Sequence, residues 1–279
     1  MFKFRIIGFI LLMALLGGIF FWKAGGFWLF LAAAPALVGA AAAEFAAMLK
    51  SSGRMAFPLP TGILVWLIAM ASLAMPAGNA DLAAFLVAFL VIAVIFTALA
   101  GLLSMRKEML EGVLNSLGVG VLMTTPLVLL LMTYLIEPYG YWLLFICLVT
   151  KATDTGGYIV GTLTAKLPGG NHKIAPDISP KKSWEGLAGG MILSLAVAWA
   201  FYYFGGGMPL AWAMLAGVVL SLGSFFGDLT ESAVKRLCGV KDSGSFVPGM
   251  GGAFDVLDSF LYNGILFWML FYSLLLWWK

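Results

Sequence analysis

The sequence predicts an all-α, polytopic helical membrane protein. Hydrophobic residues make up 62% of the 279-residue chain and charged residues only 10%, and the mean hydropathy is +1.03. Apolar runs of more than about 18 residues, the length a helix needs to cross a bilayer, recur from end to end. These runs are continuously apolar and do not alternate with polar residues, so helices and not the strands of a barrel satisfy the backbone hydrogen bonds in lipid.

We expect about nine transmembrane helices. The first run ends on Phe20, Phe21 and Trp22, where a cleavable signal peptide would carry small residues, so we expect a retained helix. The expected spans are 5–22, 25–48, 60–77, 82–104, 113–136, 140–163, 187–205, 209–230 and 254–278.

The basic residues predict an N-in, C-out orientation. Of the 16 Lys and Arg residues, only Lys23 and Lys279 fall outside under this topology and Lys151 lies within a span, which leaves thirteen on the cytoplasmic side. This asymmetry follows the positive-inside rule. It also accounts for the net charge of +3, which therefore gives no reason to expect nucleic-acid binding.

Cysteine and histidine offer little for chemistry. Cys147 falls in a span and Cys238 in a loop, so neither a disulfide nor a cysteine metal site is expected. His172 is the only histidine, and a lone loop histidine is more often a bystander than a ligand. We find no zinc motif, phosphate-binding P-loop, nucleophile elbow or dinucleotide fingerprint.

Charged residues inside the sixth expected span need an explanation. Lys151 and Asp154 are three positions apart and so share one face of a helix. They either form a structural ion pair with each other or line a polar cavity, since ionisable groups in a membrane usually face an oppositely charged partner or a cavity. The glycines after Asp154 in TDTGGY favour the cavity, because they allow a ligand or a second backbone to come close.

Two further carboxylate pairs flank a glycine-rich loop. Asp228 and Glu231 end the eighth span, and Asp255 and Asp258 open the ninth, each pair at i, i+3. An Asp at a helix N-terminus can simply match the helix dipole, but this does not account for two carboxylates on one face. Oxygen ligands of this kind suit Mg²⁺, which bridges carboxylates to substrate phosphates.

The loop between the sixth and seventh spans is basic. Lys181 and Lys182 follow Pro180 and precede three glycines that enter the next helix. The lysines act either as a positive-inside tether or as an anion-binding corner at a helix start, and this segment alone does not decide between the two.

Three ordered segments resemble the phosphatidate cytidylyltransferases (CDP-diacylglycerol synthases). That family's signature has a Ser followed by x-x-Lys-Arg, then Lys-Asp, Pro-Gly-His-Gly-Gly and Asp-Arg-x-Asp. The chain has the same order and spacing in Ser232, Lys235-Arg236, Lys241-Asp242, Pro248-Gly249, Gly251-Gly252, Asp255 and Asp258. Upstream, DTGGYIVG from Asp154 and ISPKKSWEG from Ile178 resemble two more family segments, and Glu44 resembles a glutamate of an early helix.

The resemblance implies transfer of CMP from CTP to phosphatidate, with Mg²⁺ as cofactor and room for a second cation. It implies metal ligands at Asp228, Asp255, Asp258 and Glu231, and catalytic or phosphate-contacting residues at Lys181, Lys182, Lys235, Arg236, Lys241 and Asp242. Substrate-binding residues would be Asp154, Ser179, Ser183, Glu185, Ser232, Gly251 and Gly252. We accordingly expect an N-terminal transmembrane region at 1–137 and a C-terminal catalytic transmembrane region at 138–279, with cytoplasmic loops at 164–186 and 231–253.

Two residues depart from the family pattern. Met250 stands where the family has His, and Val256 stands where it has Arg. Neither Met nor Val can donate a hydrogen bond to a phosphate. A diverged cytidylyltransferase acting on another lipid phosphate, or an inactive paralogue, is therefore the nearest alternative.

The expected partners are CTP, phosphatidate and membrane lipids, with a homodimer left open. A membrane transporter is the alternative from another class. Transporters often carry repeated halves with paired broken helices, and the sequence shows neither. Its polar residues instead gather at one cytoplasmic level.

Overall fold

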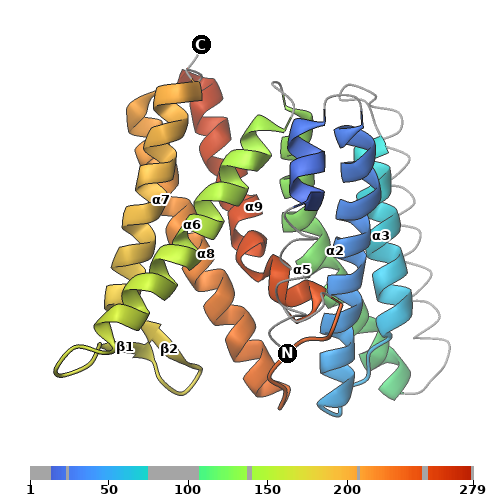
Figure 1. The fold of residues 1–279 in the computed structure, drawn as a ribbon. Coiled ribbons are helices and arrows are strands. Elements are labelled where there is room, and N and C mark those ends of the chain that lie inside the picture. Colours follow the sequence, from blue (N-terminus) through green and yellow to red (C-terminus); the bar gives the residue numbers. More distant parts are fainter. Residues whose placement is uncertain are drawn as a thin grey trace. The chain divides into compact units, whose positions relative to one another are not determined.

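The computed structural model describes residues 14–22, 25–74, 107–136, 140–205, 208–246 and 251–277. They form helices apart from one small two-stranded sheet (Figure 1). Among the described residues, six helices are long and apolar enough to cross a membrane, and the helix at Pro58–Ala74 is apolar but shorter. The all-α, polytopic membrane fold is therefore confirmed. The number nine stays a prediction, because the span at 82–104 and half of that at 5–22 lie outside the described residues.

The chain divides into two compact units. The first contains 1–140 and 237–257, and the second contains 141–236 and 258–279. The predicted boundary at 137 lies close to the first of these divisions. The segment 237–257, which we placed in the C-terminal region, is grouped with the first unit.

The first unit is built on three long helices, α2 (Gly26–Ser51), α3 (Pro58–Ala74) and α5 (Lys107–Met132), with the 3₁₀ turn η1 (Thr133–Leu135) after α5. The three helices pack on one another. Apolar side chains such as Val38, Val65 and Leu127 fill their core. Between α2 and α3 the chain is tied to α5, because Ser116 accepts a hydrogen bond from the backbone N–H of Phe57 at 2.9 Å.

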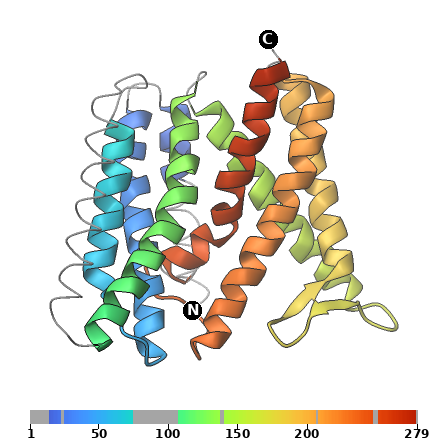
Figure 2. The ribbon, with the colours of Figure 1, turned by 180° about the vertical axis from the view of Figure 1, so that it is seen from behind.

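The second unit contains α6 (Tyr141–Thr164), β1 (Lys173–Ala175), β2 (Ser179–Ser183), α7 (Trp184–Gly205), nearly all of α8 (Leu210–Leu237) and most of α9 (Ala253–Trp277). Figures 1 and 2 show the β-hairpin at the end of the α6–α7 pair. Edge-to-face rings join α6, α8 and α9, with Trp142 contacting both Trp212 and Phe271. This aromatic core fixes the three helices from which the polar residues project.

The polar loops are shorter than the sequence predicts. Helix α8 continues to Leu237 and not to 230, because five of the seven residues at 231–237 are good helix formers and an i, i+4 ion pair joins Glu231 to Lys235. Hydropathy marks where the apolar segment ends, not where the helix ends. Glu185 and Gly186, expected in a loop, lie in the first turn of α7.

The antiparallel hairpin β1–β2 was not predicted. Its turn runs from Ala175 to Ile178, whose N–H donates to the Ala175 carbonyl at 3.2 Å. Pro176 and Asp177 occupy the central positions of this turn, where Pro fixes the backbone angle that a β-turn requires. The hairpin places Lys181 and Lys182 on a strand and not on an irregular corner.

Glycines bring α6 and α7 into close contact. A Cβ atom on Gly156 would lie 2.5 Å from the Gly189 carbonyl oxygen, and one on Gly190 would lie 2.7 Å from the Thr153 carbonyl oxygen. Such distances leave no space for a methyl group at either position. The two helices therefore approach each other backbone to backbone, as small residues permit in membranes.

We expect Gly156→Ala to destabilise the protein by about 1–3 kcal/mol, the usual cost of overpacking a filled core. Gly118→Ala is the matched control, because a Cβ atom on this α5 glycine would meet nothing within 4 Å. The stability of both variants is measured by thermal unfolding in detergent, monitored as the loss of monodisperse protein. Equal midpoints for the two variants would contradict the tight α6–α7 contact.

Candidate active site

Three carboxylates converge in the second unit. Asp228 and Glu231 project from α8, and Asp258 projects from α9. One oxygen from each lies within 4.8 Å of the others. Glu231 and Asp258 are buried, at 4% and 6% exposure. Hard divalent cations take oxygen ligands of this type, so the donor set fits such a cation.

Lysines neutralise two members of this acidic cluster (Asp228, Glu231 and Asp258). The Lys182 ammonium group lies 2.9 Å from the Asp228 carboxylate and donates to the Phe225 carbonyl oxygen at 3.0 Å. Lys235 pairs with Glu231 one turn along α8. Asp258 forms no lysine ion pair within 4.0 Å among the described residues, and it accepts the backbone N–H of Ser259. An ionised Asp258 would therefore leave the cluster with one negative charge that no lysine ion pair compensates.

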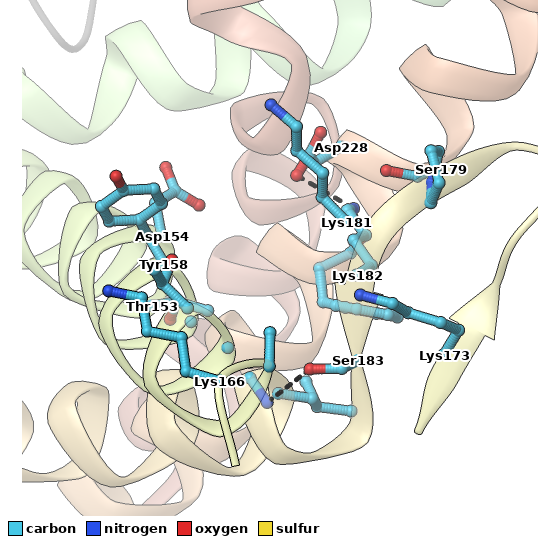
Figure 3. Close-up of a pocket in the computed structure, with 18 residues that line it drawn as sticks. Thr153, Asp154, Tyr158, Lys166, Lys173, Ser179, Lys181, Lys182, Ser183 and Asp228 are labelled. Carbon is cyan, nitrogen blue, oxygen red and sulfur yellow. Dashed lines mark hydrogen bonds and ion pairs between the residues drawn. The ribbon is translucent and has the colours of Figure 1, made fainter. Parts of the chain in front are cut away.

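A pocket of about 590 Å³ opens beside the acidic cluster. Its lining on α6 runs from Thr153 to Thr162, about 14 Å at 1.5 Å per residue, and continues to Lys166 just past the end of the helix. Figure 3 shows α6 on one side and β2 on the other, with Lys182 directed at Asp228. Four lysines line the pocket: Lys166, Lys173, Lys181 and Lys182. Its volume lies in the range of small-molecule sites, and its lysines suit a polyanion.

Asp154 lies at the deep end of the pocket and joins two helices. Its carboxylate pairs with Lys151 at 3.0 Å and accepts the hydroxyl of Ser224 on α8 at 3.2 Å. Ser224 precedes Asp228 by four residues on α8, so both face the same side of that helix. The Lys151–Asp154 ion pair that the sequence left open exists, and its carboxylate also lines the pocket.

Ser183 and Glu185 hold the hairpin at the end of α6 and α7. The Ser183 hydroxyl accepts the N–H of Gly186 at 3.1 Å, which is a helix N-cap, and it accepts from the Asn171 side chain at 3.2 Å. The Glu185 carboxylate binds His172 through both the backbone N–H and the ring, the latter at 2.6 Å. His172 thus fastens the hairpin to α7.

In the first unit, Asp255 caps the start of α9. Its carboxylate accepts the N–H of Gly252 at 2.7 Å and that of Ser243 at 3.3 Å. An acidic residue at the third helical position commonly bonds back to the N-cap N–H in this way. The metal-ligand assignment of Asp255 stays a prediction that this geometry does not support.

Glu44 of α2 also binds the start of α9 and Ser243. It accepts the N–H of Phe254 and the hydroxyl of Ser243, each at 3.0 Å. Gly251 has φ +110°, a conformation that glycine adopts readily. A Cβ atom on Gly252 would collide with the Ser243 hydroxyl and with Glu44.

The sequence of the whole chain matches a known family. The model described as "Cytidylyltransferase family" covers residues 3–274. The chain belongs to the cytidylyltransferase family. Similar proteins named phosphatidate cytidylyltransferase include one from Staphylococcus saprophyticus, 44% identical over 123 residues, and one from Haemophilus influenzae, 38% identical over 150 residues.

These matches are partial in length. The Staphylococcus match covers 44% of this chain and 45% of the relative, and the Haemophilus match covers 51% and 50%. A third relative of that name, from Mycobacterium bovis, is 40% identical over 129 residues. This match covers 46% of this chain and 40% of the relative. The chain thus aligns with about half the length of its curated relatives.

The remaining predicted residues of this cytidylyltransferase family member fall in different places. Ser179 lines the pocket, whereas Ser232 and Arg236 lie on the last turns of α8. Lys241 and Asp242 belong to the segment of the first unit, so their role beside the acidic cluster stays a prediction. Met250 lies outside the described residues, and Val256 lies in the first turn of α9.

Sequence reasoning missed several pocket residues. Lys166 and Lys173 were counted only as topological charges, and Tyr158 only as part of a motif, yet all three line the pocket. Ser224 was also missed, although it precedes Asp228 by four residues and this spacing could have placed it on the same helix face. Lys166 lies in the turn just after α6 ends at Thr164, and no helical spacing in the sequence links it to Asp154.

Proposed function

We propose that this protein transfers CMP from CTP to phosphatidate and releases CDP-diacylglycerol and pyrophosphate. The observation that carries the proposal is the acidic cluster beside a lysine-lined pocket, within helices that suit a membrane. A polyphosphate and a lipid phosphate must meet there, and both are anionic. The family membership and the names of the relatives favour this reaction over a transporter.

In this proposal an oxygen of the phosphatidate phosphate attacks the α-phosphorus of CTP. The new bond forms as the bond from the α-phosphorus to the bridging oxygen breaks, and pyrophosphate leaves with the electron pair. No covalent intermediate on the protein is required. Lys166, Lys173 and Lys181 would bind the β- and γ-phosphates, since fixed cations stabilise charge that develops on a leaving group.

We assign Asp228, Glu231 and Asp258 to a divalent cation, Mg²⁺ in the simplest case, with a second cation also compatible. When bound, the cation supplies positive charge to phosphate oxygens at the reacting centre. Charge balance supports this assignment. Lysines pair with Asp154, Asp228 and Glu231, so this group of four carboxylates and three lysines carries a net charge of minus one when Asp258 is ionised. A divalent cation brings it to plus one, which attracts an incoming phosphate.

Lys182 would act by positioning the β-hairpin and, with it, Lys181. Its contacts with Asp228 and the Phe225 carbonyl fix the β-hairpin against α8, and this keeps Lys181 over the pocket. Asp154 would close the deep end of the pocket through Ser224. Arg236 and Lys241 remain proposed phosphate contacts on the strength of the family motif, and Asp242 remains a proposed supporting residue.

We place the protein in the bacterial inner membrane with the pocket facing the cytoplasm, where CTP is made. The basic residues of the two polar loops support this orientation through the positive-inside rule. A homodimer is compatible with the proposal but plays no part in it.

The test uses purified protein, CTP labelled at the α-phosphate, phosphatidate vesicles and Mg²⁺. We expect labelled CDP-diacylglycerol, dependent on phosphatidate and abolished by EDTA. Labelled product with another lipid phosphate and none with phosphatidate would indicate the diverged relative. No product with any lipid phosphate would contradict the proposed function.

A further inference from the structure

Lys151 is a charged residue that the proposed reaction has not yet used. It is the eleventh of 24 residues in the apolar helix α6, which makes it central in a span. A charge at this depth is costly unless it faces a polar partner or a cavity. The structure supplies a partner in Asp154 but does not bury the pair, since the side chains are 47% and 38% exposed.

The ammonium group of Lys151 has donors to spare. One N–H is directed to Asp154 at 3.0 Å, and the group lies 5.4 Å from the ring centroid of Phe260 on α9. Among the described residues no other acceptor contacts it. A lysine ammonium carries three donors, so two remain for a ligand.

The surroundings of Lys151 combine an anion-binding group with apolar surface. Asp154 lines the pocket, and an electrostatic attraction acts between the Lys151 ammonium and Asp258, so the ammonium lies near the acidic cluster. On the same exposed side of α6, Leu148 is 45% and Ile159 47% exposed. A helix face that presents a cation between apolar side chains matches a ligand with an anionic head and hydrocarbon chains.

We propose that Lys151 binds the phosphate of the lipid substrate, with the acyl chains against the exposed apolar face of α6. The inference rests on the proposed function for the identity of the substrate, a lipid phosphate monoester. It divides the site into two parts. The lysines near the hairpin take the polyphosphate, and Lys151 takes the lipid phosphate at the opposite end, with the acidic cluster beside it.

The ion pair with Asp154 does not conflict with this role. Asp154 already accepts from Ser224, which holds its carboxylate while Lys151 reorients its other donors. The pair also keeps the ammonium in place before the lipid arrives. If Lys151 served only to neutralise Asp154, removing both charges together would leave phosphatidate binding unchanged. The double variant therefore distinguishes charge neutralisation from binding of the lipid phosphate.

The experiment measures binding of dioctanoyl phosphatidate to purified protein in detergent by intrinsic tryptophan fluorescence, apart from turnover. Lys151→Gln keeps a donor for Asp154 but loses the charge. We expect it to raise the dissociation constant for dioctanoyl phosphatidate about tenfold or more, the typical value of a charge-assisted hydrogen bond. Lys151→Arg should stay within about threefold, and binding of CTP and Mn²⁺ should not change. Lys50→Gln, an exposed lysine on α2, is the matched control.

Several results would overturn the inference. These are unchanged phosphatidate affinity in Lys151→Gln, an equal loss of CTP affinity, or restored phosphatidate affinity in Lys151→Gln combined with Asp154→Asn. Displacement of the lipid by inorganic phosphate at similar concentrations would show that the acyl chains contribute nothing, which also contradicts it. Lys151-dependent lipid binding in a protein without transferase activity would instead refute the proposed function and leave this inference standing.

Discussion

Asp258→Asn should reduce turnover about 10³-fold or more while the protein stays folded. A metal ion contributes several kcal/mol to stabilising developing charge, and each 1.4 kcal/mol is about tenfold in rate. Asn has the size of Asp and its carbonyl oxygen can still accept the N–H of Ser259, so the fold should tolerate it. The measurement is the initial rate with saturating CTP and phosphatidate across a range of Mg²⁺ concentrations.

Asp177→Asn is the matched control, because Asp177 is exposed in the turn of the β-hairpin and lies outside the pocket lining. It should keep the wild-type rate. Near-wild-type turnover of Asp258→Asn at ordinary Mg²⁺, with both variants equally monodisperse, would remove Asp258 from the catalytic site.

Lys182→Met should lower kcat/KM for CTP by about 10²–10³-fold, the cost of removing one preorganised donor from a reacting centre. Met retains most of the side-chain volume but leaves the carboxylate of Asp228 and the carbonyl of Phe225 without their donor. The acidic cluster would then carry an additional uncompensated charge. Steady-state kinetics with varied CTP measure the effect.

Two comparisons make the Lys182 result specific. Lys181→Met changes the neighbouring pocket residue, which has no ion pair in the described structure, and should cost less. Lys107→Met changes an exposed residue at the start of α5 and should be neutral. If all three variants lose the same activity, the general positive charge of the protein matters and the specific Lys182–Asp228 contact does not.

Much of the fold could be predicted from the sequence because one requirement dominates it, the need of apolar segments in lipid to satisfy their own backbone hydrogen bonds. Long apolar runs must form helices in lipid, so the described long helices lie close to their predicted spans. The hairpin was missed because hydropathy shows only that residues 164–186 are polar. The Pro176-Asp177 turn, with two short segments around it, was the local signal that could have revealed it.

The candidate site was predictable in part. The i, i+3 spacing of Asp228 and Glu231 placed them on one face of α8, but no spacing rule brings Asp258 of α9 to them. The link was suggested because both carboxylate pairs flank one glycine-rich loop, and the family resemblance agreed with it; the structure brings the three together. Asp255 shares the helix face of Asp258 by the same rule, yet the backbone N–H groups of Ser243 and Gly252 take its carboxylate. Sequence spacing does not show such competition.

The central claim is that Asp228, Glu231 and Asp258 form a divalent-cation site, and titration with Mn²⁺ followed by electron paramagnetic resonance tests it most directly. We expect the wild-type protein to bind Mn²⁺ in competition with Mg²⁺. Asp258→Asn should weaken this binding at least about tenfold, and Asp177→Asn should leave it unchanged. A wild-type protein that binds no Mn²⁺, or an Asp258→Asn variant that binds it as tightly as wild type, would contradict the account.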